Sequence, residues 1–539
     1  MARLYDLRST LPEILKGVPG VKSFDGQLWR LPHNTRPLLG EPRQLLSADK
    51  TRHLVSKLPL LSAEARSRMT EHQLRLIGGA LSAPAHHFWA PAGSGKTLAA
   101  LASQAGTAQR GALVVVCPAG VVPGWERQIL RWTLLDPRPL TGQTPHKIVN
   151  EKGAVYLIGW EVLKFWKREL RALKPQAILL DETHTLRRPK HSRAIQQRDG
   201  SVKFESLDNT LSAAIDIMKT AKSRYSLTAS PIPGRVADLW VQLHLVEPWQ
   251  WGSFYEFAQR YCGPTHNGYG YEYRGVSCAE ELRSRLTAIR TYISLSETHK
   301  NLPAKRREVV RIPHGQQDKP VGMKREIKKA AKSGDAQTFL EALLMEAASR
   351  KETITKRRVL DACLSGQKVV IFTARRRHCE RLADSIKKLL GQKCPRAQVM
   401  SGHGEQSVDE REKTRLAYMA HPGPCVLVGT GDAWGVGIDL QDTDLCLMVM
   451  LPWTPDKVIQ WEGRFHRLGQ SRPVLISYLI CEGTADERVA DTVVISLRTS
   501  SRSRKSVSLL ASTMLSQGST PPLRGGLPCC PVSLGDRCD

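Results

Sequence analysis

The stretch HFWAPAGSGKTLAALASQA, residues 87–105, places a short apolar run before a glycine-containing turn and a helix-forming segment. Small residues in such a turn let backbone N–H groups wrap around a phosphate at a helix N-terminus. The pattern therefore predicts a phosphate-binding loop. In it, Lys96 would reach the β- and γ-phosphates of a nucleotide, and the hydroxyl of Thr97 would bind Mg²⁺. The backbone cradle itself would come from Gly93, Ser94 and Gly95.

A second stretch, LLDETH (179–184), ends an apolar run with two acids. Ligands of parallel sheets lie at the carboxyl ends of the strands, so both acids would face the nucleotide. Asp181 would hold Mg²⁺, directly or through water, and Glu182 would orient or deprotonate the attacking water. The alternative is an acid pair that caps the next helix. His184 would either couple this site to another lobe or simply cap and pack.

Apolar runs of this kind recur along the chain and predict its organisation. Over residues 61–245 they alternate with helical segments, which is typical of a buried parallel sheet. Residues 246–365 break the rhythm with an aromatic-rich and then basic, helical stretch, and the alternation returns over 366–495. Residues 1–60 form a mixed accessory segment, and the Ser-, Arg-, Pro- and Gly-rich tail 496–539 predicts disorder. We expect an α/β protein of two blocks with a helical basic insertion between them.

The charge balance indicates a polyanionic partner. The chain has 79 Lys and Arg residues against 51 acids, a formal net charge of +28. Such an excess favours nucleic acid or an anionic membrane surface. A membrane is disfavoured, because the most apolar stretch (112–125) is too short to span a bilayer and contains prolines. With no secretory signal, we expect an intracellular, cytoplasmic protein, nucleoid-associated if the source is a prokaryote or a phage.

The twelve cysteines carry no recognisable ligand pattern. Nine are scattered singly in apolar or mixed segments, without the paired Cys or His spacing of a zinc site. We expect them to be reduced thiols in the core. The remaining three lie in the tail, at Cys529, Cys530 and Cys538.

The stretch QWEGRFHRLGQ, residues 460–470, is expected to form one helix. At about 100° per residue, one face would carry the polar side chains Gln460, Arg464 and Arg467. A second, apolar face would anchor the helix through Trp461, Phe465 and Leu468. Glu462 would point away from the arginines and could not neutralise them. The two arginines would then be available to an anion.

The order APAGSGKT, DETH, LTASP, GVGIDL and QWEGRFHRLGQ resembles that of superfamily 2 helicases and translocases. Longer segments resemble Swi/Snf-type ATPases, above all their annealing-helicase branch: EHQLRLIGGAL (71–81), VVCPAGVVPGWERQI (115–129) and the region from Asp444 to Gln470. The resemblance covers residues 65–490.

This resemblance implies two RecA-like lobes with ATP and Mg²⁺ in the cleft between them and DNA across the top. Carried over by position, Gln73 would bind adenine, and Gly437 and Asp439 would contact the nucleotide or transmit its state. Arg464 and Arg467 would be arginine fingers, with Gln460 beside them. Asp439 stands where Swi/Snf-type proteins usually have Asn, and Gly463 where they usually have an acid. These departures favour a general superfamily 2 helicase.

We therefore expect an ATP-dependent DNA helicase or translocase. Three alternatives stay open: a duplex-DNA translocase or remodeller that separates no strands, an RNA-dependent ATPase, and a nucleic-acid-binding scaffold with a vestigial ATP site. The presence of Lys96, Asp181 and Glu182 counts against the scaffold.

Contacts with nucleic acid are expected to be made to the backbone, because no base-reading module is recognisable. The basic insertion from Lys305 to Arg358 would either bind phosphates or form a solvated helical face. Thr228 and Ser230 of LTASP would relay hydrogen bonds between the lobes or form an ordinary turn. Four aromatic side chains would either stack on bases or pack in the insertion: Trp249, Trp251, Phe254 and Tyr255.

Overall fold

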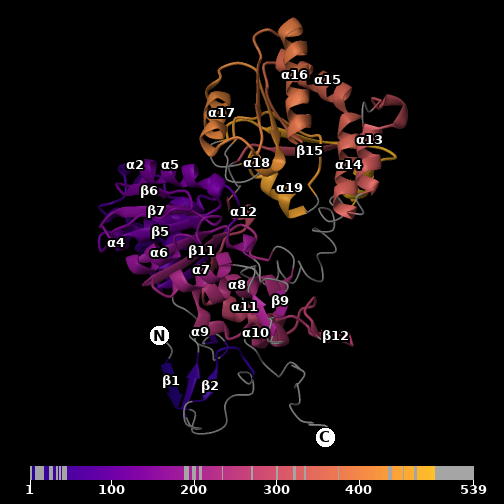
Figure 1. Ribbon diagram of the computed structural model, residues 1–539. Helices are drawn as coiled ribbons and strands as arrows, with labels where there is room; N and C mark the ends of the chain where they lie inside the picture. The colour runs from indigo at the N-terminus through magenta and orange to yellow at the C-terminus, as the bar shows by residue number, and fades with distance from the viewer. Residues whose placement is uncertain are drawn as a thin grey trace.

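A computed structural model gives the structure of this chain (Figure 1). It describes residues 3–6, 17–23, 28–31, 34–35, 38, 45–186, 193–196, 202–205, 209–232, 235–268, 271–298, 302–319, 323–332, 335–373, 375–434, 440–452, 455–466 and 470–491. The predicted disorder of the tail therefore concerns residues that lie outside the described ranges.

The first lobe is built on a seven-stranded parallel sheet. Its strands in chain order are β4 (Ala85–Trp89), β5 (Leu113–Cys117), β6 (Asp136–Leu140), β7 (Ala154–Gly159), β8 (Ala177–Asp181), β11 (Ser223–Thr228) and β14 (Arg290–Tyr292). Across the sheet they follow the order β14-β4-β11-β8-β5-β7-β6. β4, which leads into the phosphate loop, and β8, which leads into the acid pair, are the two neighbours of β11. Because the strands are parallel, both motifs lie at the carboxyl ends of the strands, on the same side of the sheet.

Helices cover both faces of this sheet, which explains why its central strands are continuous apolar runs. They are α3 (Glu71–Leu81), α4 (Lys96–Ala108), α5 (Val122–Trp132), α6 (Lys167–Leu173), α7 (Asn209–Met218) and α8 (Leu239–Val246). The two faces bury separate apolar clusters, one around Leu101 and Val115 and the other around Trp166 and Ile178. An antiparallel pair, β9 (Arg193–Gln196) and β10 (Val202–Glu205), follows the acid pair in the chain.

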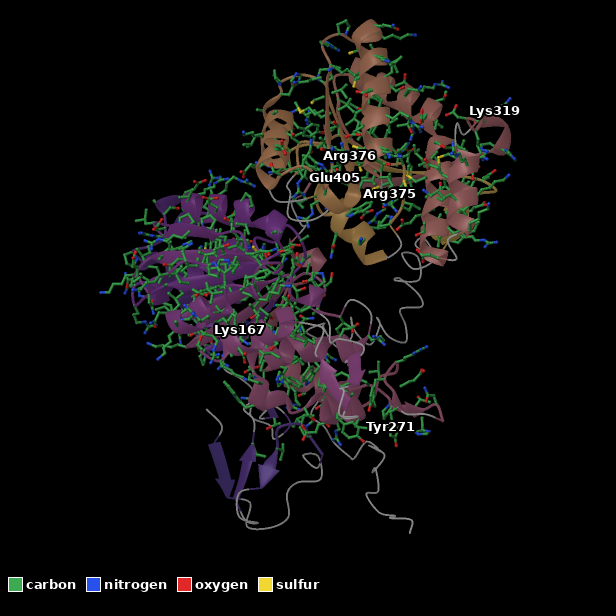
Figure 2. All side chains as sticks on the ribbon, in the orientation of Figure 1. Lys167, Tyr271, Lys319, Arg375, Arg376 and Glu405 are labelled. Atoms are coloured by element: carbon green, nitrogen blue, oxygen red, sulfur yellow. The ribbon has the colours of Figure 1, made fainter. Side chains whose placement is uncertain are left out.

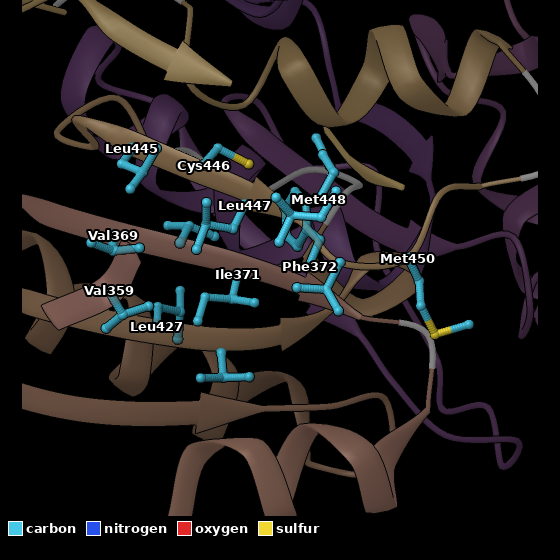
Figure 3. Packing of buried hydrophobic residues seen from close by; sticks show 14 of the residues in the cluster. Val359, Val369, Ile371, Phe372, Leu427, Leu445, Cys446, Leu447, Met448 and Met450 are labelled. Atoms are coloured by element: carbon cyan, nitrogen blue, oxygen red, sulfur yellow. The ribbon is translucent and has the colours of Figure 1, made fainter. Parts of the chain in front are cut away.

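The second lobe is built on a six-stranded parallel sheet of order β15-β20-β19-β16-β18-β17. Its strands are β15 (Lys305–Ile312), β16 (Lys368–Thr373), β17 (Gln398–Gly402), β18 (Cys425–Thr430), β19 (Leu445–Met448) and β20 (Val474–Cys481). Figure 3 shows Ile371, Leu427 and Leu447 packed together on neighbouring strands of the core. The covering helices include α16 (Arg376–Lys393), α17 (Val408–Ala420), α18 (Gly431–Trp434) and α19 (Pro455–Glu462).

The two expected parallel-sheet lobes are thus present, and the structure divides the expected insertion 246–365 between them. Its first part packs beside lobe one and supplies β14, and its second part begins with β15 of lobe two (Figure 1). The first part holds α9 (Pro248–Trp251), α10 (Phe254–Tyr261), the hairpin of β12 (Thr265–His266) and β13 (Tyr271–Glu272), and α11 (Ala279–Thr287). After α12 (Leu295–Thr298), the second part holds α13 (Met323–Lys332), α14 (Ala336–Ser349) and α15 (Glu352–Leu364). We propose that the lobe boundary lies between residues 293 and 305.

The aromatic side chains of the first part differ in their surroundings. Trp251 is buried and Phe254 packs against the same cluster, as the packing interpretation predicts. Trp249 and Tyr255 are 49% and 60% exposed, and the guanidinium of Arg224 lies 4.3 Å from the ring centroid of Trp249.

The N-terminal segment forms a small antiparallel sheet of β1 (Arg3–Asp6), β3 (Leu28–Leu31) and β2 (Lys22–Ser23), followed by α1 (Ala48–Ser56) and α2 (Ala63–Ser67). Arg285 of α11 ties it to the first lobe, because its Nη2 donates to Pro19 O at 2.9 Å and to Asn34 Oδ1 at 3.0 Å. Among the described residues, all nine cysteines are free thiols, and eight of them are buried.

Within the described ranges, none of the helices has the length and apolar character that a membrane crossing requires.

Candidate active site

The phosphate loop between β4 and α4 has the backbone that its glycines predict. Gly93 and Gly95 adopt φ angles of 79° and 77°, a left-handed conformation that favours glycine. Ser94 between them is buried, and its Oγ has no hydrogen-bond partner among the described residues. A Cβ atom on Gly95 would stand 2.1 Å from Nε2 of Gln73. The side chain of Gln73 from α3 therefore packs directly against the backbone of the loop, and leaves no room for a side chain at Gly95.

Gln73 lies in the first turn of α3 and reaches the phosphate loop. Its Oε1 accepts the backbone N–H of Thr70 at 3.0 Å, and its Nε2 lies 3.5 Å from Ser94 O. His72 Nε2 donates to the same carbonyl at 3.0 Å. The structure thus brings the candidate adenine-binding residue to the loop, while its contact with adenine stays a prediction.

Lys96 opens α4 and points back into the loop. Its Nζ donates to the carbonyl oxygens of Ala90 at 2.9 Å and Pro91 at 3.1 Å. These oxygens hold the ammonium in the concave side of the turn, where a phosphate group would lie. Thr97 follows on the first turn of the helix and is partly exposed. Both side chains therefore lie where the sequence predicts them.

Asp181 and Glu182 lie at the carboxyl end of β8, facing the loop. Burial raises the pKa of Asp181, and the neighbouring charge of Glu182 adds to the rise. For Glu182, burial also acts upward, but the hydrogen bond and charge of His184, with the charges of Lys96 and Arg464, lower its pKa below the ordinary value. The pair is therefore unequal, with Glu182 the more acidic carboxyl. An ionised Glu182 is the form that can accept a proton from water.

Two tryptophans hold the acid pair in place, and both were missed from the sequence. Trp125 Nε1 donates to Asp181 Oδ2 at 2.8 Å, and Trp160 Nε1 donates to the Asp181 carbonyl at 3.1 Å. Trp125 belongs to the segment 115–129 that follows the phosphate loop. Trp125 lies in the first turn of α5, and a lone indole after the stretch PAGVVPG was the available signal, but a sequence cannot show which carboxylate it meets.

His184 connects the acid pair to the second lobe. Its Nδ1 lies 2.9 Å from Thr228 Oγ1 and 3.2 Å from Glu182 Oε2, and its Nε2 lies 3.3 Å from Gln460 Nε2. The imidazole thus bridges Glu182 and Thr228 on one side and the side-chain amide of Gln460 on the other. His184 and Thr228 therefore lie between the acid pair and the second lobe, and their coupling role stays a prediction. Ser230 joins through its backbone N–H, 3.1 Å from Thr228 Oγ1.

Arg464 is buried and faces the acid pair from the second lobe. Burial lowers the pKa of its guanidinium, while the charges of Glu182 and Asp181 oppose that effect. The expected single helix over 460–470 is wrong. α19 ends at Glu462, and Arg464 lies on the turn that follows, with its N–H bonded to Trp461 O at 3.0 Å. Gly463 at this point has a low helix propensity, so the helix stops there.

Four predicted residues lie outside the described ranges, namely the site residues Gly437, Asp439 and Arg467 and the apolar anchor Leu468. Their roles stay predictions. The apolar anchors within the described part behave as expected, because Trp461 and Phe465 are buried against Phe372, with ring centroids 5.2 and 5.7 Å from it.

The residues present fit a bound Mg²⁺–nucleotide. The buried Asp181 carboxylate, disfavoured as an isolated charge, is the kind of oxygen ligand that Mg²⁺ takes together with nucleotide phosphates. Thr97 can supply a second oxygen. Ser94 Oγ, buried at the loop without a partner in the described part of the chain, offers a donor to a phosphate oxygen.

Comparison with known families agrees with this arrangement. Residues 88–368 match the SNF2-related domain family, and residues 355–469 match the Helicase conserved C-terminal domain family. The first match spans more than half of the chain. This chain belongs to the SNF2-related family. By class it is therefore a nucleic-acid-dependent ATP hydrolase, and the expected resemblance to Swi/Snf-type superfamily 2 ATPases is confirmed.

Its relatives include proteins named for chromatin and for DNA annealing. It is 28% identical over 407 residues to the Xenopus laevis "SWI/SNF-related matrix-associated actin-dependent regulator of chromatin subfamily A-like protein 1", covering 73% of this chain and 40% of that protein. It is 24% identical over 423 residues to the Homo sapiens "DNA annealing helicase and endonuclease ZRANB3", covering 73% and 36%. The chain thus spans about 40% or less of the length of these relatives.

Among solved structures, the chain is similar to the Sulfolobus solfataricus SWI2/SNF2 ATPase core domain, with 18% identity and a TM-score of 0.39 over 84% of this chain and 92% of that chain. The same core in complex with dsDNA matches with 20% identity and a TM-score of 0.37, over 82% and 93%.

Proposed function

We propose that this SNF2-related ATPase couples ATP hydrolysis to movement along DNA and acts as a DNA helicase or translocase. One observation carries the proposal. Glu182 and Asp181 of the first lobe face Arg464 of the second, and His184 contacts Gln460 across the same cleft. A hydrolysis site assembled from two lobes is complete only when the lobes approach each other. Its chemistry is thereby coupled to their relative movement.

Each residue has a defined task in this proposal. Lys96 leaves the Ala90 and Pro91 carbonyls and binds the β- and γ-phosphates. Thr97 and Asp181 would hold Mg²⁺, which supplies charge neutralisation at the phosphates when bound. Glu182 orients the attacking water and accepts its proton.

Arg464 meets the negative charge that develops on the γ-phosphate in the transition state. An arginine in this role contributes about 10³- to 10⁵-fold in rate. Its movement with the second lobe would make hydrolysis depend on closure. The His184 link to Gln460 gives the first lobe a second, polar sensor of the same movement.

Basic side chains for the DNA backbone lie at the carboxyl edge of the second sheet. Arg375 and Arg376 lie shortly after the end of β16 at Thr373, and Figure 2 shows both on the second lobe. Arg376 Nε donates to Glu380 Oε1 at 2.8 Å, and Arg375 contacts Glu341. Exposed guanidinium groups held by acids can exchange those partners for phosphates.

A second basic surface lies on α13, where exposed cations follow a helical spacing of three, four and seven residues. They are Arg325, Lys328, Lys329 and Lys332. This arrangement puts all four on one helix face. We propose that this basic stripe of α13 contacts phosphates without sequence preference.

The names of the relatives support DNA as the partner and bear on whether the protein separates strands. One is named a DNA annealing helicase and another a regulator of chromatin, so we favour DNA over RNA and an intracellular, DNA-associated location. A cytoplasmic or nucleoid location stays a prediction. The annealing name also favours a second candidate function, movement along duplex DNA without strand separation.

An ATPase panel tests the proposal. Turnover of the full chain would be measured without nucleic acid and with single-stranded DNA, duplex DNA, forked DNA and RNA. Stimulation by at least one DNA form and none by RNA is expected. Equal turnover in all five samples would contradict a DNA-driven motor. A strand-displacement assay beside a triplex-displacement assay then separates the two outputs, because a duplex translocase removes only the third strand.

A further inference from the structure

The turn that carries Arg464 is fastened on both sides. Two residues before it, the carboxylate of Glu462 is 1% exposed and sits among three donors of the second lobe. Lys305 Nζ donates to its Oε2 at 3.0 Å, and Arg307 and Tyr478 donate to the same carboxylate. Burial acts to raise the pKa of Glu462, but these partners hold it below its ordinary value. The charged carboxylate of Glu462 therefore attaches the end of α19 to the start of β15.

Two residues after Arg464, His466 makes the other attachment. Its Nε2 lies 2.9 Å from Pro303 O. A carbonyl oxygen only accepts, so Nε2 carries the proton. Burial lowers the pKa of His466, which keeps the imidazole neutral. Its partner Pro303 does not belong to the second sheet but to the segment that joins the two lobes.

The backbone of Arg464 is held between these attachments. Its N–H donates to Trp461 O, and its carbonyl accepts from Leu440 N–H, both at 3.0 Å. The position of the guanidinium is thus set by the turn as a whole. A shift of the turn relative to Pro303 would move Arg464 relative to Glu182 and Asp181.

The joining segment is also attached to the first lobe, near the nucleotide. Ile293 N–H donates to Trp89 O at 2.9 Å. Four residues on, Glu297 accepts the Ser294 N–H at 2.6 Å and contacts Arg75, which lies two residues after Gln73 on α3. The joining segment thus contacts the helix that carries Gln73 at Glu297 and the turn that carries Arg464 at Pro303.

We propose that His466 is a positioning residue: its hydrogen bond to Pro303 sets Arg464 against the acid pair and makes the placement of the arginine respond to the connection between the lobes. This inference rests on the proposed ATPase function. The contact of His466 with Pro303 lies beside the turn that carries Arg464, so its effect on hydrolysis passes through the position of Arg464. The interaction with the γ-phosphate strengthens in the transition state, so losing the correct placement lowers kcat more than it weakens ATP binding.

Two amide substitutions form a matched pair for the test. In His466→Gln, the side-chain amide nitrogen reaches about as far as histidine Nε2 and can still donate to Pro303 O. In His466→Asn, the amide stands where Nδ1 stood and falls short. Both are polar and of similar bulk, so a general cost of burying an amide affects both. Glu462 is unsuited to this test, because its replacement would leave buried cations without a partner.

DNA-stimulated ATPase activity of the full chain would be measured for both variants, for Arg464→Ala and for the double variant His466→Asn/Arg464→Ala. We expect His466→Asn to lower kcat about tenfold with KM for ATP within about twofold, and His466→Gln to stay within about threefold of wild type. In the Arg464→Ala background, His466→Asn should cause no further loss, since the two changes remove one interaction.

Three results would overturn the inference: equal kcat for the Gln and Asn variants, a loss in the Arg464→Ala background as large as that in wild type, or a loss confined to KM. The proposed function fails separately, if wild type shows no DNA-stimulated turnover or if Arg464→Ala retains full activity. Thermal unfolding of each variant identifies loss of folded protein. If only the Asn variant unfolds, the loss of kcat is structural and the inference is contradicted.

Discussion

Glu182 holds its carboxylate on a backbone that few side chains adopt. Its φ angle of 50° lies in the left-handed region, which costs a non-glycine residue about 1–2 kcal/mol. The bend turns the chain sharply after β8, so that Asp181 and Glu182 both face the phosphate loop although they are adjacent. Strain of this kind persists where the surrounding structure enforces it, and here Trp125 and His184 hold the two side chains.

Glu182→Gln should therefore abolish turnover while leaving binding intact. The amide keeps the volume of the side chain but cannot accept a proton from water, a contribution of about 10²- to 10⁴-fold. ATPase rates and DNA affinity would be measured side by side. Lys96→Ala is the matched variant on the phosphate side, with loss of both turnover and ATP affinity expected. DNA-stimulated turnover that persists in either variant would disprove the site.

His378 of α16 should make the second lobe sensitive to acid. Its Nδ1 lies 2.6 Å from Thr373 Oγ1, and burial, aided by the charges of Arg381 and Lys351, lowers its pKa to about 3. Glu352, with its carboxylate 4.0 Å from Nε2, is too weak a partner to reverse this. In the unfolded chain the imidazole binds a proton near pH 6.5, so stability is lost as the pH falls below that value.

The substitution His378→Asn tests this at one residue. It keeps an amide near the Nδ1 position but removes the titration. We expect the unfolding midpoint to fall less between pH 7 and pH 5 in the variant than in wild type, whatever its absolute stability. Parallel curves would show that other groups cause the acid sensitivity.

The proposed catalytic residues that belong to short motifs could be predicted from the sequence. Lys96 and Asp181 lie close together because their motifs stand at the carboxyl ends of β4 and β8, and Arg464 approaches them from the turn after α19. Trp125 and the two attachments of the Arg464 turn could not be predicted. They join residues far apart in the chain, and no local pattern states which carbonyl or carboxylate an indole or imidazole will meet.

At the level of elements, three strands of the two large sheets have no continuous apolar run and could not be predicted from the sequence. All three, β6, β14 and β15, are edge strands. β6 has two prolines in five residues, β14 is three residues long and β15 begins with four charged residues in a row. Edge strands tolerate proline and charge because one side meets no neighbouring strand. Their composition therefore resembles that of loops. The central strands, such as β5, are apolar on both faces and were recognised.

Lys351 at the start of α15 ties three elements together from inside the second lobe. Its fully buried Nζ donates to Val449 O and Leu479 O, both at 2.6 Å, and contacts the buried carboxylate of Asp486. Lys351→Met should lower the free energy of unfolding by about 3–5 kcal/mol, because Asp486 would remain as an isolated buried charge. Chemical denaturation measures this.

A second substitution separates charge from packing. If the cost arises from the stranded carboxylate, Lys351→Met/Asp486→Asn should be more stable than Lys351→Met alone. An equal or lower stability of the double variant would contradict that explanation.

The basic stripe of α13 should contribute to DNA affinity through phosphates alone. Replacing its four cations with Gln should weaken binding of any duplex sequence and reduce the slope of log affinity against log salt by up to about 0.9 per lost contact. The matched control replaces four exposed cations at and beyond the distal end of α16, Lys387, Lys388, Lys393 and Arg396. Equal effects of both sets would mean that only total charge matters.

At the scale of the molecule, the lobes also meet away from the nucleotide. Arg127 of α5 contacts Glu412 of α17, and Arg415 Nη2 donates to the same carboxylate at 2.9 Å. This pair and the His184–Gln460 contact span the cleft at two points. The relative placement of the lobes therefore depends on side chains from both sheets.

Arg127→Met should lower kcat/KM for ATP by about two- to fivefold, the value of a partly exposed ion pair that favours the approach of the lobes. The loss should shrink at high salt. Arg131→Met is the control, because Arg131 lies on the same helix but pairs with Glu64 of its own lobe at 3.0 Å. Equal losses in both variants would refute a role for lobe approach.

The two-lobe architecture followed from the recurrence of apolar runs, but the assignment of residues 246–365 did not. The composition of this segment differs from that of both sheets. Its backbone hydrogen bonds nevertheless place β14 in the sheet of the first lobe and β15 in the sheet of the second lobe. Pairing between distant strands is not visible in local composition.

That division has a consequence for how the protein is made. Among the described residues, β15 has β20 as its only neighbour in the sheet, yet a ribosome releases β15 long before Val474–Cys481 is translated. During that interval the nascent strand has both edges open, the condition in which chains aggregate. Its cations, Lys305, Arg306, Arg307 and Arg311, repel a second copy and act as gatekeepers. These charges make the sequence of β15 unlike that of a typical strand, and they should also protect the nascent strand from aggregation during synthesis.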